Sequence, residues 1–241
     1  MNLGEHLNES LKFATIFTVR VSGLEIPITE TVVVTWIVMA VLIIPALFAG
    51  KMLKEVPKGW QCLLESGIEF LDSVSEQYFG HWAKAFGPYI GTIFLFLMVA
   101  NIIPAFSPIE AFGRIPPFKI KPPARDINLT AAVAFLTISL VLIGGLRARG
   151  LKGWLKNLLY PIPIMLPFNV LDYFIRPLSL CLRLFGNILG GFIVITLIDA
   201  VAPIGIPVVL SIYFDFVDGL IQAVVFTFLS VLFISEAVEV Q

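Results

Sequence analysis

Long runs of apolar residues alternate with short polar segments along most of the chain. Residues 31–50 contain no charged residue, and about 20 residues of α-helix are needed to cross roughly 30 Å of hydrocarbon. Two further runs of spanning length cover residues 87–106 and 126–147. The pattern predicts an all-α integral membrane protein in which residues 1–241 form a single membrane domain.

The last third of the chain holds two apolar segments, residues 168–201 and 206–240, that are longer than a simple span requires. At about 1.5 Å per residue each could extend roughly 50 Å, so we expect both to be strongly tilted or to lie partly along the membrane. Pro203 and Pro207 bracket the turn between them. These segments predict a long oblique hairpin and bring the expected number of membrane helices to about five.

Residues 60–80 carry a different pattern, in which polar side chains recur every three or four positions. This spacing places them on one face of a helix, with apolar residues on most of the opposite face. The polar positions are Gln61, Glu65, Glu69, Asp72 and Glu76. We therefore expect an amphipathic helix at the membrane interface, whose acidic face is solvated or contacts a partner.

Basic residues predict how the spans are oriented, because Lys and Arg remain preferentially on the cytoplasmic side. Eight fall in segments predicted to be inside: Lys51, Lys54, Lys58, Lys84, Arg147, Arg149, Lys152 and Lys156. The predicted outer loop has four: Arg114, Lys119, Lys121 and Arg125. This bias predicts an N-terminus outside and a C-terminus in the cytoplasm.

Composition supports the membrane class and excludes others. The chain is 58% hydrophobic and 14% charged, and its mean hydropathy is +0.95. A net charge of -1 provides no basic surface for nucleic acid, so lipid and not nucleic acid is the expected partner. With two cysteines and two histidines, neither a disulfide framework nor a metal or cofactor site is predicted.

A stripe of polar residues crosses the first long segment. Arg183 lies about fifteen residues from either end of that segment, where a charged side chain costs roughly 2.5 to 17 kcal/mol and usually marks an ion path. Such a charge must face protein or water. The alternative is an internal ion pair of Arg183 with Asp199, Asp215 or Asp218. The stripe, spaced four, seven and four residues apart, is Asp172, Arg176, Arg183 and Asn187, with Gly186, Gly190 and Gly191 beside it.

Several short motifs resemble those of subunit a of F-type ATP synthases, in the bacterial and chloroplast form. The resemblance extends from residue 124 to residue 237 in the family's order and is specific as a set, although each short motif alone is weak. The motifs are Ala124-Arg125-Asp126-Ile127-Asn128, Asn169-Val170-Leu171-Asp172, Pro177-Leu178-Ser179-Leu180, Arg183-Leu184-Phe185-Gly186-Asn187-Ile188, Ile221-Gln222-Ala223, Phe226-Thr227 and Ser235-Glu236-Ala237.

The resemblance implies that the chain is the ion-conducting stator of a rotary motor in an energy-coupling membrane, such as a bacterial inner membrane. The hairpin is then expected to pack against a ring of c subunits, each bearing one carboxylate. Arg183 corresponds to the family's essential arginine, which separates two half-channels for H+ or Na+. Asn187 and Gln222 match polar residues near it, and Asp172 and Arg176 are further ion-path candidates.

The same resemblance implies b-type peripheral stalk subunits and a soluble F1 head as further partners, and no ATP-hydrolysing site in this chain. A secondary transporter or another polytopic channel subunit is the alternative. The chain shows no repeated halves of the kind that transporters carry, and no nucleophile with a base for an intramembrane enzyme.

Two positions depart from the family pattern. Phe192 stands where other members carry an acidic residue, and Asp215 stands where some carry a histidine. Asp215, Asp218 and Gln222 share one helix face at steps of three and four. We therefore predict that Asp215 or Asp218 supplies the carboxylate that Phe192 cannot. The alternative is a structural role for these aspartates, as partners of an arginine or as a helix cap.

Overall fold

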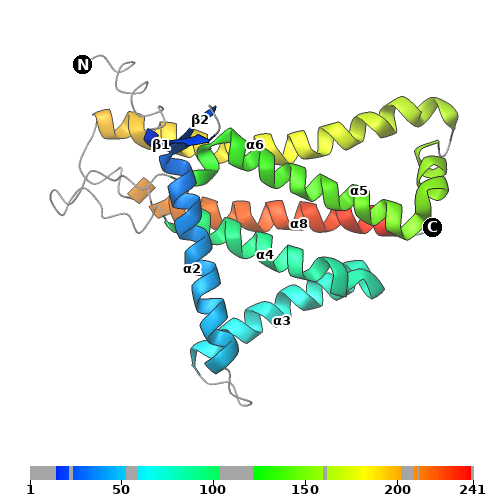
Figure 1. Ribbon diagram of the computed structural model, residues 1–241, viewed down its shortest axis with the longest axis horizontal. Helices are drawn as coiled ribbons and strands as arrows, with labels where there is room; N and C mark the ends of the chain where they lie inside the picture. Colours follow the sequence, from blue (N-terminus) through cyan, green and yellow to red (C-terminus); the bar gives the residue numbers. More distant parts are fainter. Residues whose placement is uncertain are drawn as a thin grey trace. The chain divides into compact units, whose positions relative to one another are not determined.

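The computed structural model describes residues 15–21, 24–52, 59–103, 122–159, 162–201, 209–210 and 212–239, most of them helical (Figure 1). Five helical stretches among them are long and apolar enough to cross a membrane: Glu30–Phe48, Leu64–Ile102, Ile127–Lys156, Pro163–Ile198 and Ile212–Val238. The prediction of an all-α membrane protein with about five membrane helices is confirmed.

The chain forms two compact units, each assembled from separate parts of the sequence. The first contains residues 1–47, 96–126 and 185–223, and the second contains residues 48–95, 127–184 and 224–241. Three long helices continue from one unit into the other: α4 (Ala83–Ile102), α6 (Leu166–Val201) and α8 (Gly219–Val238).

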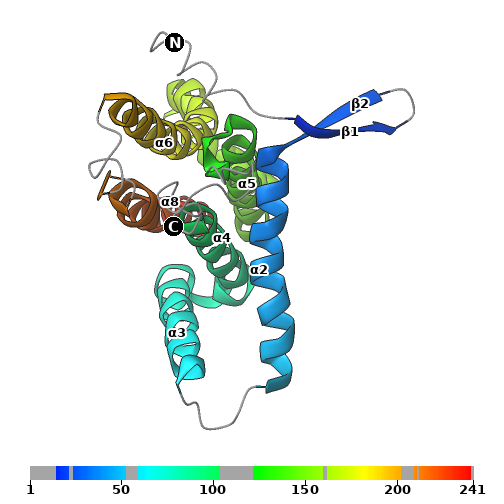
Figure 2. The same cartoon turned by 90° about the vertical axis from the view of Figure 1, so that its left-hand side faces the viewer.

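The first unit begins with a β-hairpin that the sequence analysis did not predict. Strands β1 (Thr15–Val21) and β2 (Leu24–Thr29) pair antiparallel, and β2 leads directly into helix α2 (Glu30–Met52), as Figure 2 shows. The signal was available, because β-branched residues fill both strands around Ser22-Gly23. The hairpin contains no long apolar run, which is the pattern that identified the other elements.

Helix α2 packs on the end of α4 within the same unit. Val34, Val38 and Ala100 are buried together, with Leu42 and Phe96 packed against them. Residues further along α2 are largely exposed, Leu47 by 67%. In a chain with a mean hydropathy of +0.95, such apolar exposure suits contact with lipid.

Two glycines of the first unit lie in close contacts, Gly191 of α6 against Phe214 and Gly219 of α8 against Asn101 of α4. A Cβ atom at Gly191 of α6 would lie 2.9 Å from Cδ1 of Phe214, and one at Gly219 would lie 2.8 Å from Cβ of Asn101. Both distances are too short for any larger residue. Phe214 belongs to the π-helix Ile212–Asp218, which continues into α8.

The second unit contains the larger core. Residues of α3 (Trp60–Phe79), α4, α5 (Ile127–Leu158) and α8 meet there. The buried members are Phe79, Phe86, Ile90, Ile138, Val141, Val231, Ile234 and Val238. Gly144 lies at this contact, since a Cβ atom there would be 3.0 Å from both Phe86 and Val238.

Helix α5 extends beyond residue 147, where the basic residues led us to expect its end. Gly150 interrupts it with φ 67° and ψ 166°, a conformation that favours glycine, and a short helical piece follows to Leu158. The basic residues therefore lie on both sides of the break at Gly150 and do not mark the end of the helical segment.

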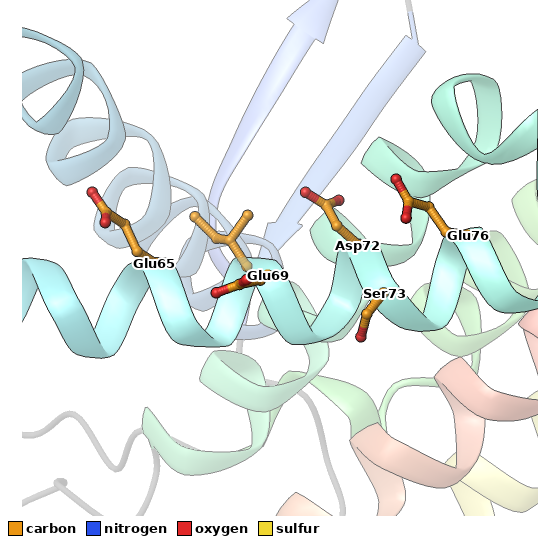
Figure 3. Close-up of a pocket in the computed structure, with 6 residues that line it drawn as sticks. Glu65, Glu69, Asp72, Ser73 and Glu76 are labelled. Carbon is orange, nitrogen blue, oxygen red and sulfur yellow. The ribbon is translucent and has the colours of Figure 1, made fainter. Parts of the chain in front are cut away.

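Helix α3 has the predicted amphipathic pattern. Figure 3 shows the carboxylates of Glu65, Glu69, Asp72 and Glu76 along this one helix, where they line a shallow open depression. Leu64 and Ile68 are also exposed, so both kinds of side chain are available to an interface. Its position at the membrane surface stays a prediction.

Several predicted features lie outside the described residues: Lys54 and Lys58, the outer loop with Arg114, Lys119 and Lys121, and the turn at Pro203 and Pro207. The side chains of Asp199 and Asp215 are also outside what the structure describes. The oblique hairpin of α6 and α8 stays a prediction.

Candidate ion-translocation site

One face of α6 is exposed along most of the helix. It carries large apolar side chains at successive turns, including Phe174, Leu178 and Leu182. Arg183, Gly186, Asn187 and Gly190 continue the same exposed face. We expect a membrane helix with this exposed surface to contact molecules other than its own chain.

Arg183 forms no salt bridge with any side chain that the structure describes. The alternative of an internal pair with Asp218 therefore finds no support, whereas Asp199 and Asp215 are not described. A guanidinium exposed on an apolar helix cannot remain against lipid at low cost. This arginine therefore needs a polar partner or water on the exposed face.

The side chain of Asn187 bonds to helix α8 inside the first unit. Its Nδ2 donates to Oε1 of Gln222 over 2.7 Å. Gln222 is 2% exposed, and its own Nε2 has no hydrogen-bond partner among the described residues. The predicted pair of polar residues is thus brought together, with one buried donor still available.

A second buried amide, that of Asn101 on α4, bonds to α8 about one turn before Gln222. Asn101 donates from Nδ2 to the carbonyl oxygen of Gly219 over 3.2 Å, and its Oδ1 has no partner among the described atoms. A buried donor on Gln222 and a buried acceptor on Asn101 are the groups that an internal water commonly satisfies. Asn101 lies inside the apolar run 87–106, which the sequence analysis treated only as a span.

Asp215 and Asp218 both lie in the π-helix Ile212–Asp218. Such wide helical turns occur frequently at functional sites. Asp218 is half-buried, one turn before Gln222 in the chain. The two aspartates thus lie in a wider helical turn than the α-helical spacing assumed, and their role in the ion path stays a prediction.

The second unit contains a polar cavity of about 190 Å³ that holds the other stripe residues. Its lining includes Asp172, Arg176, Arg149, Asn169, Tyr173 and Glu236. Arg176 forms a salt bridge with Glu236 (Nη2 to Oε1, 2.9 Å) and lies over the ring of Phe233 at 5.1 Å. Glu236, which the sequence analysis named only as part of a motif, is thus a partner of Arg176, although its side chain is 62% exposed.

Arg149 also joins this cavity and contacts the end of α8. Its Nη2 donates to the carbonyl oxygens of Glu236 and Glu239, where a cation is favourable because the last carbonyls of a helix carry partial negative charge. Trp154 donates to the hydroxyl of Tyr173 over 3.2 Å, and both residues line the same cavity. The sequence analysis assigned Arg149 only a role in orientation.

The sequence analysis did not predict the ion pair between Arg125 and Glu30 of the first unit. Arg125 donates to Glu30 over 2.7 Å, and its guanidinium carbon lies 4.8 Å from the ring centre of Phe192. Burial lowers the pKa of the Arg125 guanidinium, while the Glu30 carboxylate opposes this change. No sequence pattern links residues 95 positions apart, so periodicity could not reveal the pair.

Among the described residues, no group of three or more His, Cys, Asp or Glu could hold a metal ion. The polar groups described in each unit are amides, single carboxylates and arginines on apolar helices. Such a set can bind and pass a proton or a monovalent cation between polar groups.

Comparison with known proteins decides the class. A sequence profile described as the ATP synthase A chain matches residues 32–235. The chain belongs to this family. It is 36% identical over 217 residues to the sodium-ion-specific ATP synthase subunit a of Propionigenium modestum, a match that covers 88% of this chain and 75% of that protein. It is 35% identical over 217 residues to ATP synthase subunit a of Moorella thermoacetica, covering 89% and 93% respectively.

Family membership fixes the general function. The chain is an ion-translocating stator subunit of the membrane sector of an F-type ATP synthase, it is part of that complex, and it is integral to a membrane. The alternative of a secondary transporter is not favoured.

Proposed function

We propose that Arg183 is the stator arginine that faces the ring carboxylates of the c subunits and separates two half-channels. The observation that carries this proposal is the exposed guanidinium on a face of α6 that also exposes the apolar side chains of Phe174, Leu178 and Leu182. Arg183 has no salt bridge to a described residue. A Cβ atom added at the adjoining Gly186 would meet nothing within 4 Å. A second helix could therefore approach closely there.

The proposed mechanism follows from the cost of charge in hydrocarbon. A ring carboxylate that faces lipid must be neutral or loaded with an ion, whereas one that faces Arg183 can be ionised. At about 4 Å and an effective dielectric near 20, the attraction is about 4 kcal/mol in favour of the ionised form. Ions are thus released on one side of Arg183 and loaded on the other, and its fixed charge opposes direct leakage.

The two groups of polar residues support two access routes. Asn187 and Gln222, hydrogen-bonded in the first unit, serve one route, and Asp215 or Asp218 provides its carboxylate. Asp172 and Arg176, in the polar cavity of the second unit, serve the other. Each elementary charge that crosses releases about 2.3 kcal/mol per 100 mV, so several ions are needed for each ATP.

The aspartates are tested by Asp215→Asn and Asp218→Asn. At least one substitution should slow ion flux through the assembled complex while the chain stays in the membrane. Full flux in both single variants and in the double variant would exclude a channel role for either residue.

The proposal includes the surroundings of the chain. The face of α6 and α8 contacts the c-ring, b-type stalk subunits hold the chain, and the F1 head lies on the cytoplasmic side of a bacterial inner membrane.

The N-terminus lies outside and the C-terminus in the cytoplasm. A cysteine near Lys152 should react with a membrane-impermeant reagent only from the cytoplasm, and one near Lys119 only from outside. Labelling of both from one side contradicts this orientation.

The central test is Arg183→Ala in the reconstituted complex. It should abolish ATP-driven ion pumping and ATP synthesis, with the chain still present in the complex. Arg183→Lys should restore little activity, since an ammonium lacks the planar, permanently charged guanidinium. Arg20→Ala is the matched control, because Arg20 is an exposed arginine with 79% of its side chain accessible. Coupled ATP synthesis by an assembled Arg183→Ala complex would contradict the proposal.

A further inference from the structure

The polar cavity of the second unit is lined by charges of both signs. The charged residues in its described lining are Arg149, Arg176, Asp172 and Glu236, and all four belong to the second unit. The volume of about 190 Å³ has room for several water molecules, since each takes about 30 Å³ in the liquid. How these charges pair therefore decides which of them is available to a passing ion.

Asp172 and Arg176 do not pair with each other. They lie four residues apart on α6, the spacing at which a carboxylate and a guanidinium on one helix commonly meet. Arg176 instead donates from Nη2 to Oε1 of Glu236 on α8, over 2.9 Å. Asp172 is exposed and forms no salt bridge with a residue that the structure describes. Its carboxylate therefore stays available in the cavity.

Further contacts hold Arg176 at α8. Its guanidinium carbon lies 5.1 Å from the ring centre of Phe233, and a guanidinium is attracted to the face of an aromatic ring. Arg149 donates to the backbone carbonyl oxygens of Glu236 and Glu239, which fixes the turn of the chain that carries the Glu236 side chain. Glu236 thus competes with Asp172 for Arg176 from a position set by its neighbours.

Stability is a weak explanation for this salt bridge. The side chain of Glu236 is 62% exposed and that of Arg176 is 23% exposed. Ion pairs open to solvent contribute little to stability, because water screens both charges and holding two long side chains in one geometry costs entropy. A role for the pair is therefore to be sought in the cavity that both residues line.

We propose that Glu236 is a positioning residue of the ion path, whose carboxylate binds Arg176 and so keeps the Asp172 carboxylate free for the translocated cation. At Asp172 a proton binds to and leaves a carboxylate oxygen, or Na+ exchanges there with water, and no other bond changes. Arg176 is the competitor for that carboxylate. The inference rests on the proposed function, in which Asp172 serves the second access route, and it gives Glu236 a role that this function leaves open.

The first experiment is Glu236→Gln in the complex reconstituted in liposomes, with ATP-driven uptake of H+ and of Na+ both measured. Uptake of the transported ion should fall by about tenfold, because a guanidinium that turns to the Asp172 carboxylate weakens its hold on a proton by about that factor or more. Normal uptake by assembled Glu236→Gln complex overturns the proposal.

Glu239→Gln is the matched control. It removes an exposed carboxylate just beyond the end of α8 that does not line the cavity, so uptake should stay unchanged. A loss equal to that of Glu236→Gln would show that any negative charge at this end of the chain has the same effect, and it contradicts the proposal.

A merely structural salt bridge predicts a different pattern among further variants. Glu236→Gln and Arg176→Gln both break the bridge, so a structural role gives equal losses and no recovery when they are combined. If Glu236 acts by occupying Arg176, Arg176→Gln should lose less uptake than Glu236→Gln. Adding it to Glu236→Gln should restore uptake several-fold for the same amount of assembled chain. Equal uptake by Glu236→Gln and the double variant overturns the proposal.

The effect should also depend on Asp172. Asp172→Asn removes the carboxylate that Glu236 keeps free, so it should itself slow uptake. Glu236→Gln should then cause little additional loss, because substitutions that act through one group are not additive. A full additional loss would show that Glu236 acts independently of Asp172, which contradicts its positioning role.

Arg183→Ala, assayed in parallel, separates failure of this inference from failure of the proposed function. If Arg183→Ala abolishes coupling while Glu236→Gln pumps normally, only the role of Glu236 is overturned. If assembled Arg183→Ala complex retains coupled ATP synthesis, the proposed function fails, and with it the basis of this inference.

Discussion

Helices α5 and α6 have similar hydropathy but different surroundings. Their most apolar stretches have mean hydropathies of 2.3 and 2.0, yet 44% of the α5 stretch is buried within the chain against 22% of the α6 stretch. Hydropathy alone therefore cannot tell a helix that builds the core from one that presents a face to other molecules. The difference lies in what the small and polar residues of each helix contact.

Polar and small residues of α5 point to neighbours inside the chain. Thr130 and Thr137 are buried, and Thr137 meets the hydroxyl of Tyr89 on α4 at 2.6 Å. Gly144 lies against Phe86 and Val238. On α6, Arg183 is exposed, and a Cβ atom at Gly186 would meet nothing within 4 Å. Glycine and polar residues thus contact the rest of the chain on α5 and are exposed on α6.

The largest effect is expected from Gly144→Leu. A Cβ atom alone would lie 3.0 Å from Phe86 and from Val238, and a whole leucine side chain overpacks the core at a typical cost of about 1–3 kcal/mol or more. The chain should be several-fold less abundant in the membrane by immunoblot. Normal abundance would show that α5 is not packed as described.

The matched substitution on α6, Gly186→Leu, should act differently. Nothing among the described residues opposes the first carbon of the new side chain, so abundance should stay normal. If α6 presents this face to the c-ring, the leucine should obstruct the contact beside Arg183 and lower coupled ATP synthesis by about tenfold, equivalent to roughly 1.4 kcal/mol. Synthesis at the normal rate would argue that this face meets only lipid.

Local sequence patterns predicted the parts of the fold that depend on local physics. Uninterrupted apolar runs identified the spans, and the three-and-four spacing of acidic residues identified α3. Arg183 was found because a charge in the middle of an apolar segment is costly wherever the chain folds. The β-hairpin could have been recognised by its β-branched residues around Ser22-Gly23, but it is not part of an apolar run.

Other features depend on partners that are distant in sequence. The Glu30–Arg125 pair and the Asn101–Gly219 contact join residues separated by 95 and 118 positions, which no periodicity encodes. The π-helix at Asp215 and Asp218 widens a turn that the sequence led us to treat as α-helical. The salt bridge of Glu236 could not be predicted either, because its partner Arg176 lies 60 positions earlier.

The smallest effect concerns the hydrogen bond between α4 and α5. Thr137→Val removes the hydroxyl that meets Tyr89 at 2.6 Å, in a site where Thr137 is 1% exposed. Interhelical hydrogen bonds in membrane proteins contribute about 0.6 kcal/mol on average and up to about 1.7 kcal/mol. The unfolding midpoint of the solubilised complex should therefore fall slightly. Adding Tyr89→Phe should lower the midpoint little further, because the double variant leaves neither hydroxyl buried without its partner. Ser179→Ala is the control on α6, where the serine is exposed, and it should leave the midpoint unchanged. An equal shift for Ser179→Ala and Thr137→Val would contradict the assignment of α5 to the interior and of the α6 face to the surface.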